Sequence, residues 1–246
     1  MRIAVLMPAF DEGERLAATL SELAAHAATH EIVVFVVDDG SRIPIAVARS
    51  PETKAVRVVL ARHPVNLGQG AAIETARRLA LDPRWHDDTT PFEAWVTMDS
   101  DGQHRAEDAL ALAAAVLDGS ADVALGDRFS GTSNVPPSRR LVLWLARIFE
   151  RATTGLVLAD AHNGLRAFGP RAIGQMRLRQ NRMAHATELT RRISKAAEPL
   201  RVVELPVSVR YTAETLAKGQ SAAGAIAILV DLFQGFLFAD AKDKVR

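Results

Sequence analysis

The fold of this 246-residue chain is indicated most clearly by the stretch E-I-V-V-F-V-V-D-D-G-S, residues 31–41. An unbroken run of β-branched and aromatic apolar residues is typical of a strand that is buried on both faces of a sheet. Two aspartates, a glycine and a serine follow at once, and this combination favours a turn. The stretch therefore predicts a central strand over residues 31–37 that ends in a polar loop.

The same succession of apolar strand, polar loop and helix recurs along the chain. Other strands are predicted over residues 2–7, 55–61, 92–98, 121–126 and 200–210, with a short one at the end of 160–168. Helices are predicted over residues 12–28, from the 66–72 turn to 81, and over 105–118, 139–157, 184–197 and 221–238. We expect Pro8 to end the first strand, because proline cannot donate a ladder hydrogen bond. Together these segments predict an α/β fold with a mostly parallel central sheet and helices on both faces.

Composition narrows the class of protein. The formal net charge is +1, so the whole chain has no electrostatic attraction to nucleic acid, and no nucleic-acid partner is expected. The chain has no cysteine, which excludes disulfides and thiolate metal sites. The apolar run before Pro8 is too short for a secretory signal, so we expect a cytoplasmic protein.

Polar motifs follow the predicted strands at the points where the strands end. In open α/β sheets, ligands bind beyond the carboxyl ends of the strands, so we expect these motifs to converge on one edge. They lie at residues 8–12, 38–41, 66–70, 99–104 and 126–129.

The segment D-S-D-G-Q-H, residues 99–104, is the candidate metal site. Aspartates two apart on an extended chain point to the same side, and carboxylate oxygens suit Mg²⁺ or Mn²⁺. Gln103 could complete the site. A calcium-binding helical loop would need a glutamate at its twelfth position, where Leu110 stands. The remaining alternative is that Asp101 only caps the following helix.

Basic side chains at loops and element ends are candidates for binding phosphates, although each one alone could be a solvated surface charge. They are Arg128, Arg139, Arg140, Arg210 and Lys218. The turn N-L-G-Q-G, residues 66–70, lacks the lysine and serine of a Walker loop. We expect it to form a tight turn that brings its backbone, including Gly68, close to a ligand.

Acidic residues at two strand ends have two possible roles. Asp38 and Asp39 could accept hydrogen bonds from a nucleoside, or could cap the turn that follows them. Glu12 could contact a ligand, or could place a charge in the first turn of its helix.

The motifs, taken in order, resemble the family 2 glycosyltransferases of the GT-A, Rossmann-like fold, and in particular the branch of the dolichol-phosphate mannose synthases and bacterial polyprenyl-phosphate glycosyltransferases. The resemblance runs from Pro8 to about Ser221. It rests on P-A-F-D-E (8–12), V-D-D-G-S (37–41), N-L-G-Q-G-A-A (66–72), D-S-D-G-Q-H (99–104), G-D-R-F (126–129), Arg139 and Arg140, D-A-H-N-G-L-R-A-F (160–168), and the late R-Y-T and K-G-Q-S (210–221).

The resemblance implies an inverting transfer of a sugar from a nucleotide diphosphate to a lipid phosphate. It implies nucleotide contacts for Pro8, Phe10, Glu12 and Asp38, and contacts with the metal and the diphosphate for Asp99, Asp101 and Gln103. It also implies contacts with the donor and acceptor phosphates for Arg128, Arg140, Arg210 and Lys218.

The sequence indicates the acid–base groups of the reaction less clearly than the metal site. Glu188 falls where the resemblance implies an acid on the acceptor side, and Asp160, His185 or Glu188 could position the acceptor. A phosphate-monoester acceptor is largely ionised at neutral pH and needs no general base. The alternatives are that Asp160 is a turn residue, and that His185 and Glu188 are exposed helix positions. Asp101 and Arg128 remain the main catalytic candidates, because a divalent cation held by Asp101 and the guanidinium of Arg128 would stabilise negative charge on the leaving diphosphate.

A lipid acceptor requires a surface that meets a membrane. Residues 222–238 are apolar but shorter than the roughly 20 residues that span a bilayer, so an interfacial or partner-packed helix is expected. The helix at 139–151 combines Trp, Phe and Leu with arginines, which suits either a bilayer surface or packing on the sheet. We divide the chain into a nucleotide-binding half (1–104), an acceptor half (105–221) and a C-terminal amphipathic helix and tail (222–246).

The sequence thus predicts a metal-assisted, peripheral glycosyltransferase at the inner face of the cell membrane, with a small membrane subunit as a possible partner. Its rivals are an enzyme of the same fold with a soluble acceptor, and a non-catalytic subunit that binds nucleotide sugars.

Overall fold

Residues 31–41 form the predicted strand and turn. In the computed structural model, β2 spans Glu31–Asp38, and every residue in it except Glu31 is buried. The structure describes residues 1–27, 30–46, 56–85, 90–130, 144, 148, 151, 155–160, 162–181 and 184–210. Arg139, Arg140, Lys218 and the predicted helix over 221–238 lie outside these residues.

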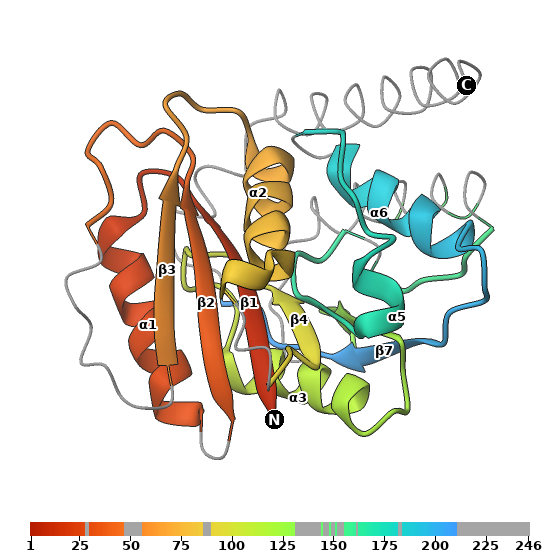
Figure 1. The fold of residues 1–246 in the computed structure, drawn as a ribbon. Helices are drawn as coiled ribbons and strands as arrows, with labels where there is room; N and C mark the ends of the chain where they lie inside the picture. The colour runs from red at the N-terminus through yellow and green to blue at the C-terminus, as the bar shows by residue number, and fades with distance from the viewer. Residues whose placement is uncertain are drawn as a thin grey trace.

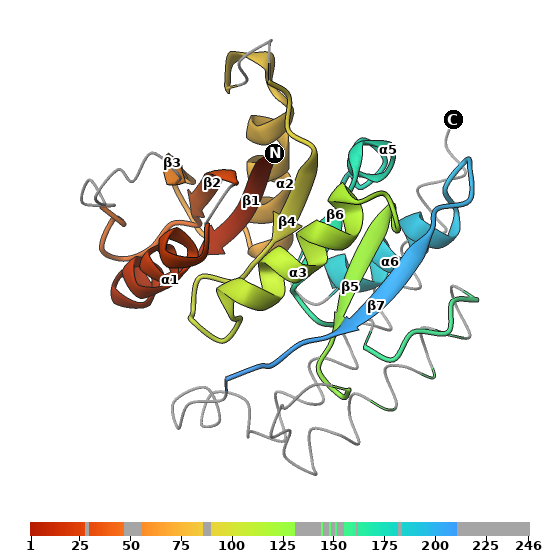
Figure 2. The ribbon, with the colours of Figure 1, turned by 90° about the horizontal axis from the view of Figure 1, so that it is seen from below.

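In the part of the chain that the structure describes, seven strands form one sheet in the order β3-β2-β1-β4-β6-β5-β7 (Figures 1 and 2). The strands are β1 (Arg2–Ala9), β2, β3 (Val56–Arg62), β4 (Ala94–Thr97), β5 (Val123–Asp127), β6 (Arg166–Phe168) and β7 (Val202–Pro206). Neighbouring strands are parallel, except that β6 runs antiparallel to both β4 and β5. The predicted α/β fold with a mostly parallel sheet is therefore confirmed, with one reversed strand that the sequence did not indicate.

Helices cover both faces of the sheet, as the alternation predicted (Figure 2). They are α1 (Gly13–His26), α2 (Gln69–Leu81), α3 (Ala106–Leu117), α5 (Pro170–Ile173) and α6 (Ala184–Ser194), with a 3₁₀ turn at Pro83–Trp85. Successive side chains of a strand point to opposite faces of the sheet, and each face has its own hydrophobic core. Val5 packs with α1 and α3 on one face, and Leu6 packs with α2, α5 and α6 on the other. This two-sided burial explains why the strands read as unbroken apolar runs.

The prediction that Pro8 ends the first strand was wrong, because β1 continues to Ala9. The Asp39 N–H donates to the Ala9 carbonyl, so residue 9 faces β2 and residue 8 faces the opposite neighbour. That neighbour, β4, ends at Thr97, opposite Leu6. The missing N–H of Pro8 therefore costs no ladder hydrogen bond.

Candidate active site

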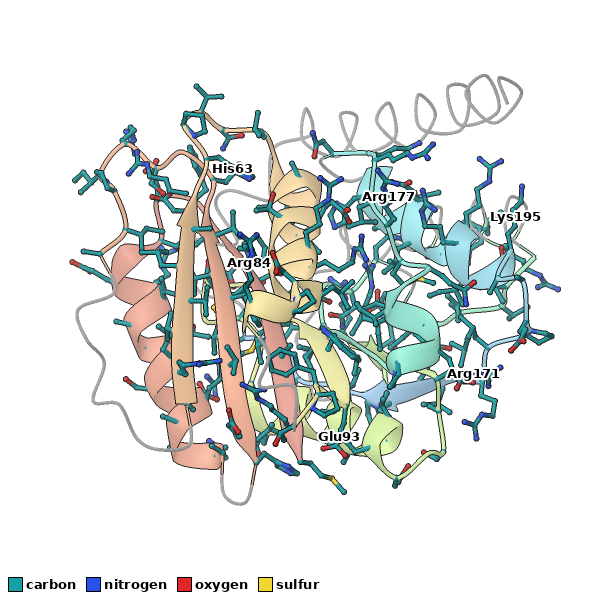
Figure 3. All side chains as sticks on the ribbon, in the orientation of Figure 1. His63, Arg84, Glu93, Arg171, Arg177 and Lys195 are labelled. Carbon is teal, nitrogen blue, oxygen red and sulfur yellow. The ribbon has the colours of Figure 1, made fainter. Side chains whose placement is uncertain are left out.

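The polar motifs do meet at one edge of the sheet. β1, β2, β3, β4 and β5 share one direction, so their carboxyl ends lie on the same side (Figures 1 and 2). Hydrogen bonds join the loops that follow them: the Asp11 N–H donates to Ser41 Oγ, and the Gln69 side-chain amide donates to Asp99. Figure 3 shows His63, whose ring contacts Asp39, at the end of β3. The predicted convergence is confirmed.

Asp99 and Asp101 form a closely spaced acidic pair just beyond β4. Asp99 Oδ1 accepts a hydrogen bond from Gln69 Nε2 at 2.8 Å. The Asp101 oxygens accept from the backbone N–H of Gln103 at 3.0 Å and from its side-chain amide at 2.8 Å. Burial raises the pKa of Asp101, and the negative charges of Asp99 and Glu12 raise it further. A cation between the two carboxylates would relieve this repulsion.

The residues of this loop fit a magnesium or manganese ion that is shared with a ligand. Within the part of the chain that the structure describes, no three His, Asp or Glu side chains are grouped so as to hold a metal by themselves. Mg²⁺ is usually held by one or two carboxylates together with substrate phosphates and waters. Asp99 and Asp101 supply such a pair, while the Gln103 amide donates to Asp101, so its role as a ligand stays a prediction.

Asp101 does not cap the following helix. The residue at the N-cap of α3 is Arg105, and no side-chain cap bond is made there. The first N–H of the helix, that of Ala106, instead donates to Glu22 Oε1 at 3.1 Å. The alternative that Asp101 only caps the helix that follows it is therefore wrong.

Asp38 and Asp39 shape the loops around the site. Asp38 is buried, and its two oxygens accept from the N–H groups of Ser41 at 2.9 Å and Ile45 at 3.1 Å, as a turn-capping aspartate would. Asp39 accepts from the N–H groups of Leu67 at 3.0 Å and Gly68 at 2.7 Å. Contacts of Asp38, Asp39 and Gly68 with a nucleotide stay predictions.

The charge of Asp38 makes part of the stability depend on pH. Burial raises its pKa, but hydrogen bonds from Ser41 and Ile45 and the charge of Arg62, 3.2 Å away, outweigh that effect and lower the pKa overall. A lowered pKa contributes stability that is present above about pH 4, the unfolded value, and is lost as pH falls through the folded value.

We therefore expect Asp38→Asn to melt at a lower temperature than the wild type at pH 7, with the difference shrinking as pH falls below about 4. Thermal melts of both proteins between pH 3 and 7 measure this, because the other carboxylates titrate alike in the two proteins. A difference in melting temperature that does not change with pH would contradict the assignment.

The 66–70 turn is held in place from several sides. Gly68 has φ of +97°, which favours glycine, and Asp39 binds the turn's N–H groups. A Cβ on Gly70 would lie 2.2 Å from the Gln180 carbonyl oxygen, so only glycine permits this approach. Asn181 Oδ1 accepts from the Ala71 N–H at 2.7 Å. Sequence reasoning missed Asn181, because the contact joins residues 110 apart.

Arg128 and Asp160 form a buried ion pair. Arg128 Nε lies 2.5 Å from Asp160 Oδ2, and the side chains are 8% and 1% exposed. The alternative that Arg128 is a solvated charge is therefore wrong. Asp160 is therefore the charge partner of Arg128 and more than a turn residue. Whether Arg128 also contacts a phosphate stays a prediction.

Arg166 is a second buried cation, and the sequence predicted no separate role for it. Burial and the charges of Arg166, Arg128 and His185 together lower the pKa of His162 to about 3. His162 is therefore neutral at physiological pH. His185 is also buried, so the expectation of an exposed helix position was wrong.

Glu188 lies on α6, and its carboxylate serves the protein itself. One oxygen accepts from the N–H groups of Arg179 and Gln180, both at 2.8 Å, and the other pairs with Arg192 at 2.7 Å. Its side chain is only 10% exposed, so the expectation of an exposed position was wrong for Glu188 as well. An acid–base role for it stays a prediction.

The other predicted contact residues lie around the same edge. Glu12 pairs with Arg15 at 2.7 Å, Phe10 is exposed, and Pro8 is buried. Arg210 pairs with Glu22 through two hydrogen bonds, and its N–H donates to the Gln103 carbonyl at 2.9 Å. The chain after β7 is thereby bound to the Asp99–Asp101 loop.

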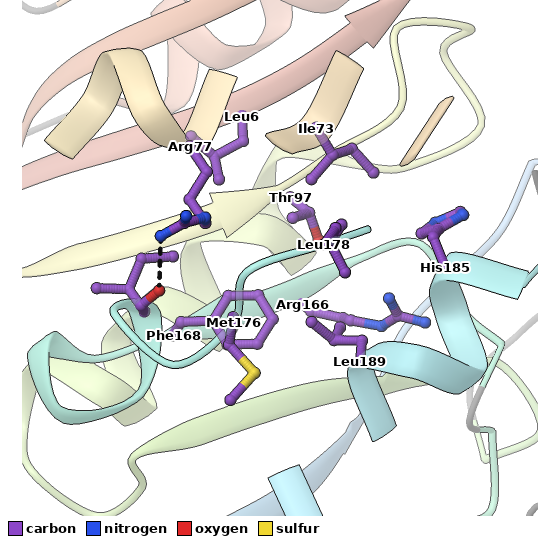
Figure 4. A pocket seen from close by; sticks show the side chains of 11 residues that line it. Leu6, Ile73, Arg77, Thr97, Arg166, Phe168, Met176, Leu178, His185 and Leu189 are labelled. Atoms are coloured by element: carbon purple, nitrogen blue, oxygen red, sulfur yellow. Dashed lines mark hydrogen bonds between the residues drawn. The ribbon is translucent and has the colours of Figure 1, made fainter. Parts of the chain in front are cut away.

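A small pocket lies away from the acidic pair, between the sheet and the helices α2, α5 and α6 (Figure 4). Its lining is mostly apolar, with Arg77, Arg166 and His185 at its edge. Neither Asp99 nor Asp101 lines it, and we assign it no part in the site.

No helix in the described ranges is both long enough and apolar enough to cross a bilayer. Two apolar side chains within the segment predicted to meet a membrane, Trp144 and Ile148, are about half exposed.

Comparisons with known proteins agree with this architecture. The model of glycosyl transferase family 2 matches residues 4–175. An undecaprenyl-phosphate mannosyltransferase of Micrococcus luteus is 29% identical over 85% of this chain and 83% of its own length. A UDP-N-acetylglucosamine–dolichyl-phosphate N-acetylglucosaminyltransferase of Methanococcus voltae is 23% identical over 88% of this chain and 89% of its own.

Among solved structures, the fold is similar to that of glucosyl-3-phosphoglycerate synthase from Mycobacterium tuberculosis in complex with Mn²⁺, UDP and phosphoglyceric acid. The TM-score is 0.62 at 15% identity, covering 95% of this chain and 78% of the other. This likeness supports a GT-A fold.

Proposed function

The chain belongs to glycosyl transferase family 2, and we propose that it transfers a sugar from a nucleoside-diphosphate sugar to a polyprenyl phosphate, assisted by Mg²⁺ or Mn²⁺. The observation that carries the proposal is the acidic pair Asp99 and Asp101 at the carboxyl edge of the sheet, where burial and the charge of Asp99 raise the pKa of Asp101. The relatives named for transfer to undecaprenyl or dolichyl phosphate support the choice of acceptor.

In the proposed reaction, an oxygen of the acceptor phosphate attacks the anomeric carbon while the bond from that carbon to the diphosphate oxygen breaks. Attack from the face opposite the leaving group inverts the configuration. A divalent cation, when bound, would neutralise charge that develops on the diphosphate. Asp99 and Asp101 would hold that cation. The acceptor phosphate is already ionised at neutral pH, so no residue has to remove a proton from it.

Buried basic residues would complement the phosphates. Arg128, which is paired with Asp160, and Arg166 are both buried. His162 stays neutral beside them. Fixed cations in a site shielded from water stabilise developing negative charge more strongly than they would in solution.

A membrane-surface location follows from the proposed acceptor. The exposed Trp144 and Ile148, four residues apart on a helix with the exposed Arg151, are suited to an anionic lipid surface. We propose that the enzyme acts peripherally at the inner face of the cell membrane, where it meets the lipid directly or through a small membrane subunit.

The test is a panel of UDP- and GDP-sugars with and without Mn²⁺, scored first by thermal shift and then by transfer to a short polyprenyl phosphate. We expect one donor to stabilise the protein in a metal-dependent way and to label the lipid phosphate. Labelling of a soluble extract component instead would favour the same-fold enzyme with a soluble acceptor. Donor binding without transfer to any acceptor would favour a non-catalytic binding subunit.

A further inference from the structure

We infer that Gln69 is a positioning residue that orients Asp99 and sets how strongly the site binds a divalent cation. This inference rests on the proposed function, because it concerns the same acidic pair. Gln69 Nε2 donates to Asp99 Oδ1 at 2.8 Å, across 30 residues of sequence. The amide supplies one directed hydrogen bond and no charge, so it fixes the carboxylate and leaves its negative charge for a cation.

Hydrogen bonds to the neighbouring backbone hold Gln69 in position. Asp39 binds the N–H groups of Leu67 and Gly68, the two residues before it. Asp39 is in turn fixed by His63, whose ring atoms lie 2.7 Å from Asp39 Oδ1 and 2.9 Å from Thr75 Oγ1.

The turn is also fixed on its far side. Asn181 accepts from the Ala71 N–H at 2.7 Å, and the Gln180 carbonyl lies too close to Gly70 for any side chain there. The amide of Gln69 is therefore presented to Asp99 by a turn that is bound on both sides.

Asp99 is confined on its other oxygen as well. A Cβ on Gly164 would lie 2.8 Å from Asp99 Oδ2, which shows how closely the chain before β6 passes it. The Asp99 N–H donates to His104 Nδ1 at 3.3 Å. With its second oxygen against Gly164 and its first on Gln69, the carboxylate has little freedom to turn. Losing an outer hydrogen-bond partner of a metal-binding carboxylate typically lowers metal affinity about 10–100-fold.

The experiment measures Mn²⁺ binding directly, by electron paramagnetic resonance of the free ion, for Mn²⁺ alone and for Mn²⁺ with UDP or GDP. In Gln69→Lys the ammonium group would pair with Asp99 and compete with the cation, so we expect the Mn²⁺ affinity to fall about tenfold or more. Gln69→Ala should lower it severalfold by freeing the carboxylate. Thermal melts should show both variants folded.

Gln175→Lys is the matched control, since Gln175 is exposed on the chain after α5 and its side-chain amide donates to the Arg171 carbonyl. It adds the same charge outside the site, and we expect wild-type Mn²⁺ affinity. If Asp101→Asn lowers Mn²⁺ binding but Gln69→Lys does not, the inference is overturned and the proposed function stands. If the wild type binds no Mn²⁺ with or without UDP or GDP, both are overturned.

Discussion

Replacing Asp101 by asparagine is expected to lower sugar transfer by about a thousandfold or more while leaving the protein folded. Each tenfold step corresponds to about 1.4 kcal/mol of lost transition-state stabilisation. An amide is a weaker ligand than a carboxylate and brings no negative charge, so a cation would be held only by Asp99. Steady-state transfer assays over a range of Mn²⁺ concentrations measure the loss.

The stability of the same variant should move in the opposite direction. Burial and the charges of Asp99 and Glu12 raise the pKa of Asp101, so its ionised form destabilises the metal-free fold at neutral pH. Removing that charge should leave the melting temperature without metal equal to or above that of the wild type. Asp118→Asn is the control, because Asp118 lies in an exposed turn after α3, where its carboxylate accepts a hydrogen bond from the Ser120 N–H. Full activity in Asp101→Asn would refute the site.

The second large effect is expected from Arg128→Ala, which should lower both stability and transfer. The substitution leaves Asp160 as a charge that is 1% exposed and has lost its guanidinium partner. Breaking a buried ion pair in this way costs about 3–5 kcal/mol. For a chain of this size that corresponds to a fall of roughly 6–20 °C in melting temperature. Thermal and urea unfolding, followed by circular dichroism, measure it.

The double variant Arg128→Ala/Asp160→Ala separates the two roles of the arginine. Removing both charges should recover part of the lost stability, while transfer stays low if Arg128 also serves the phosphates. Arg84→Ala is a matched control, since Arg84 forms an ion pair with Asp82 in which its own side chain is 83% exposed, and its melting temperature should hardly change. A fully stable Arg128→Ala would show that the pair contributes nothing to the fold.

Local sequence patterns predicted most of the architecture because they report burial directly. The runs at residues 2–7 and 31–37 lie within buried strands and the run at 121–126 overlaps the buried strand β5, so their composition shows both the type and the position of these elements. The edge on which the polar motifs meet followed from the direction that parallel strands share. Where the structure describes them, helix and strand ends differed from prediction by only a few residues, the short α5 helix was not predicted, and the predicted helices over 139–157 and 221–238 stay predictions.

Other features depend on contacts that no local pattern encodes. The direction of β6 is set by pairing on both sides of a strand of three residues. The partner of Arg128 is 32 residues away, and that of Arg210 is 188 residues away. Pro8 stays within β1 only because β4 happens to end beside it. Predicting these features requires knowing which helices and strands become neighbours in the fold. A single sequence does not contain this information in any local pattern.

The reversed direction of β6 has a consequence for how such a protein can diversify. Arg166, the first residue of β6, lies opposite Leu125 near the end of β5. The chain therefore leaves the sheet after β5 and re-enters it in β6 at the same edge. The number of residues between Phe129 and Ala159 can change during evolution while the strand order on either side is preserved, whereas Arg128, Asp160 and Gly164 at the two ends of this segment must stay.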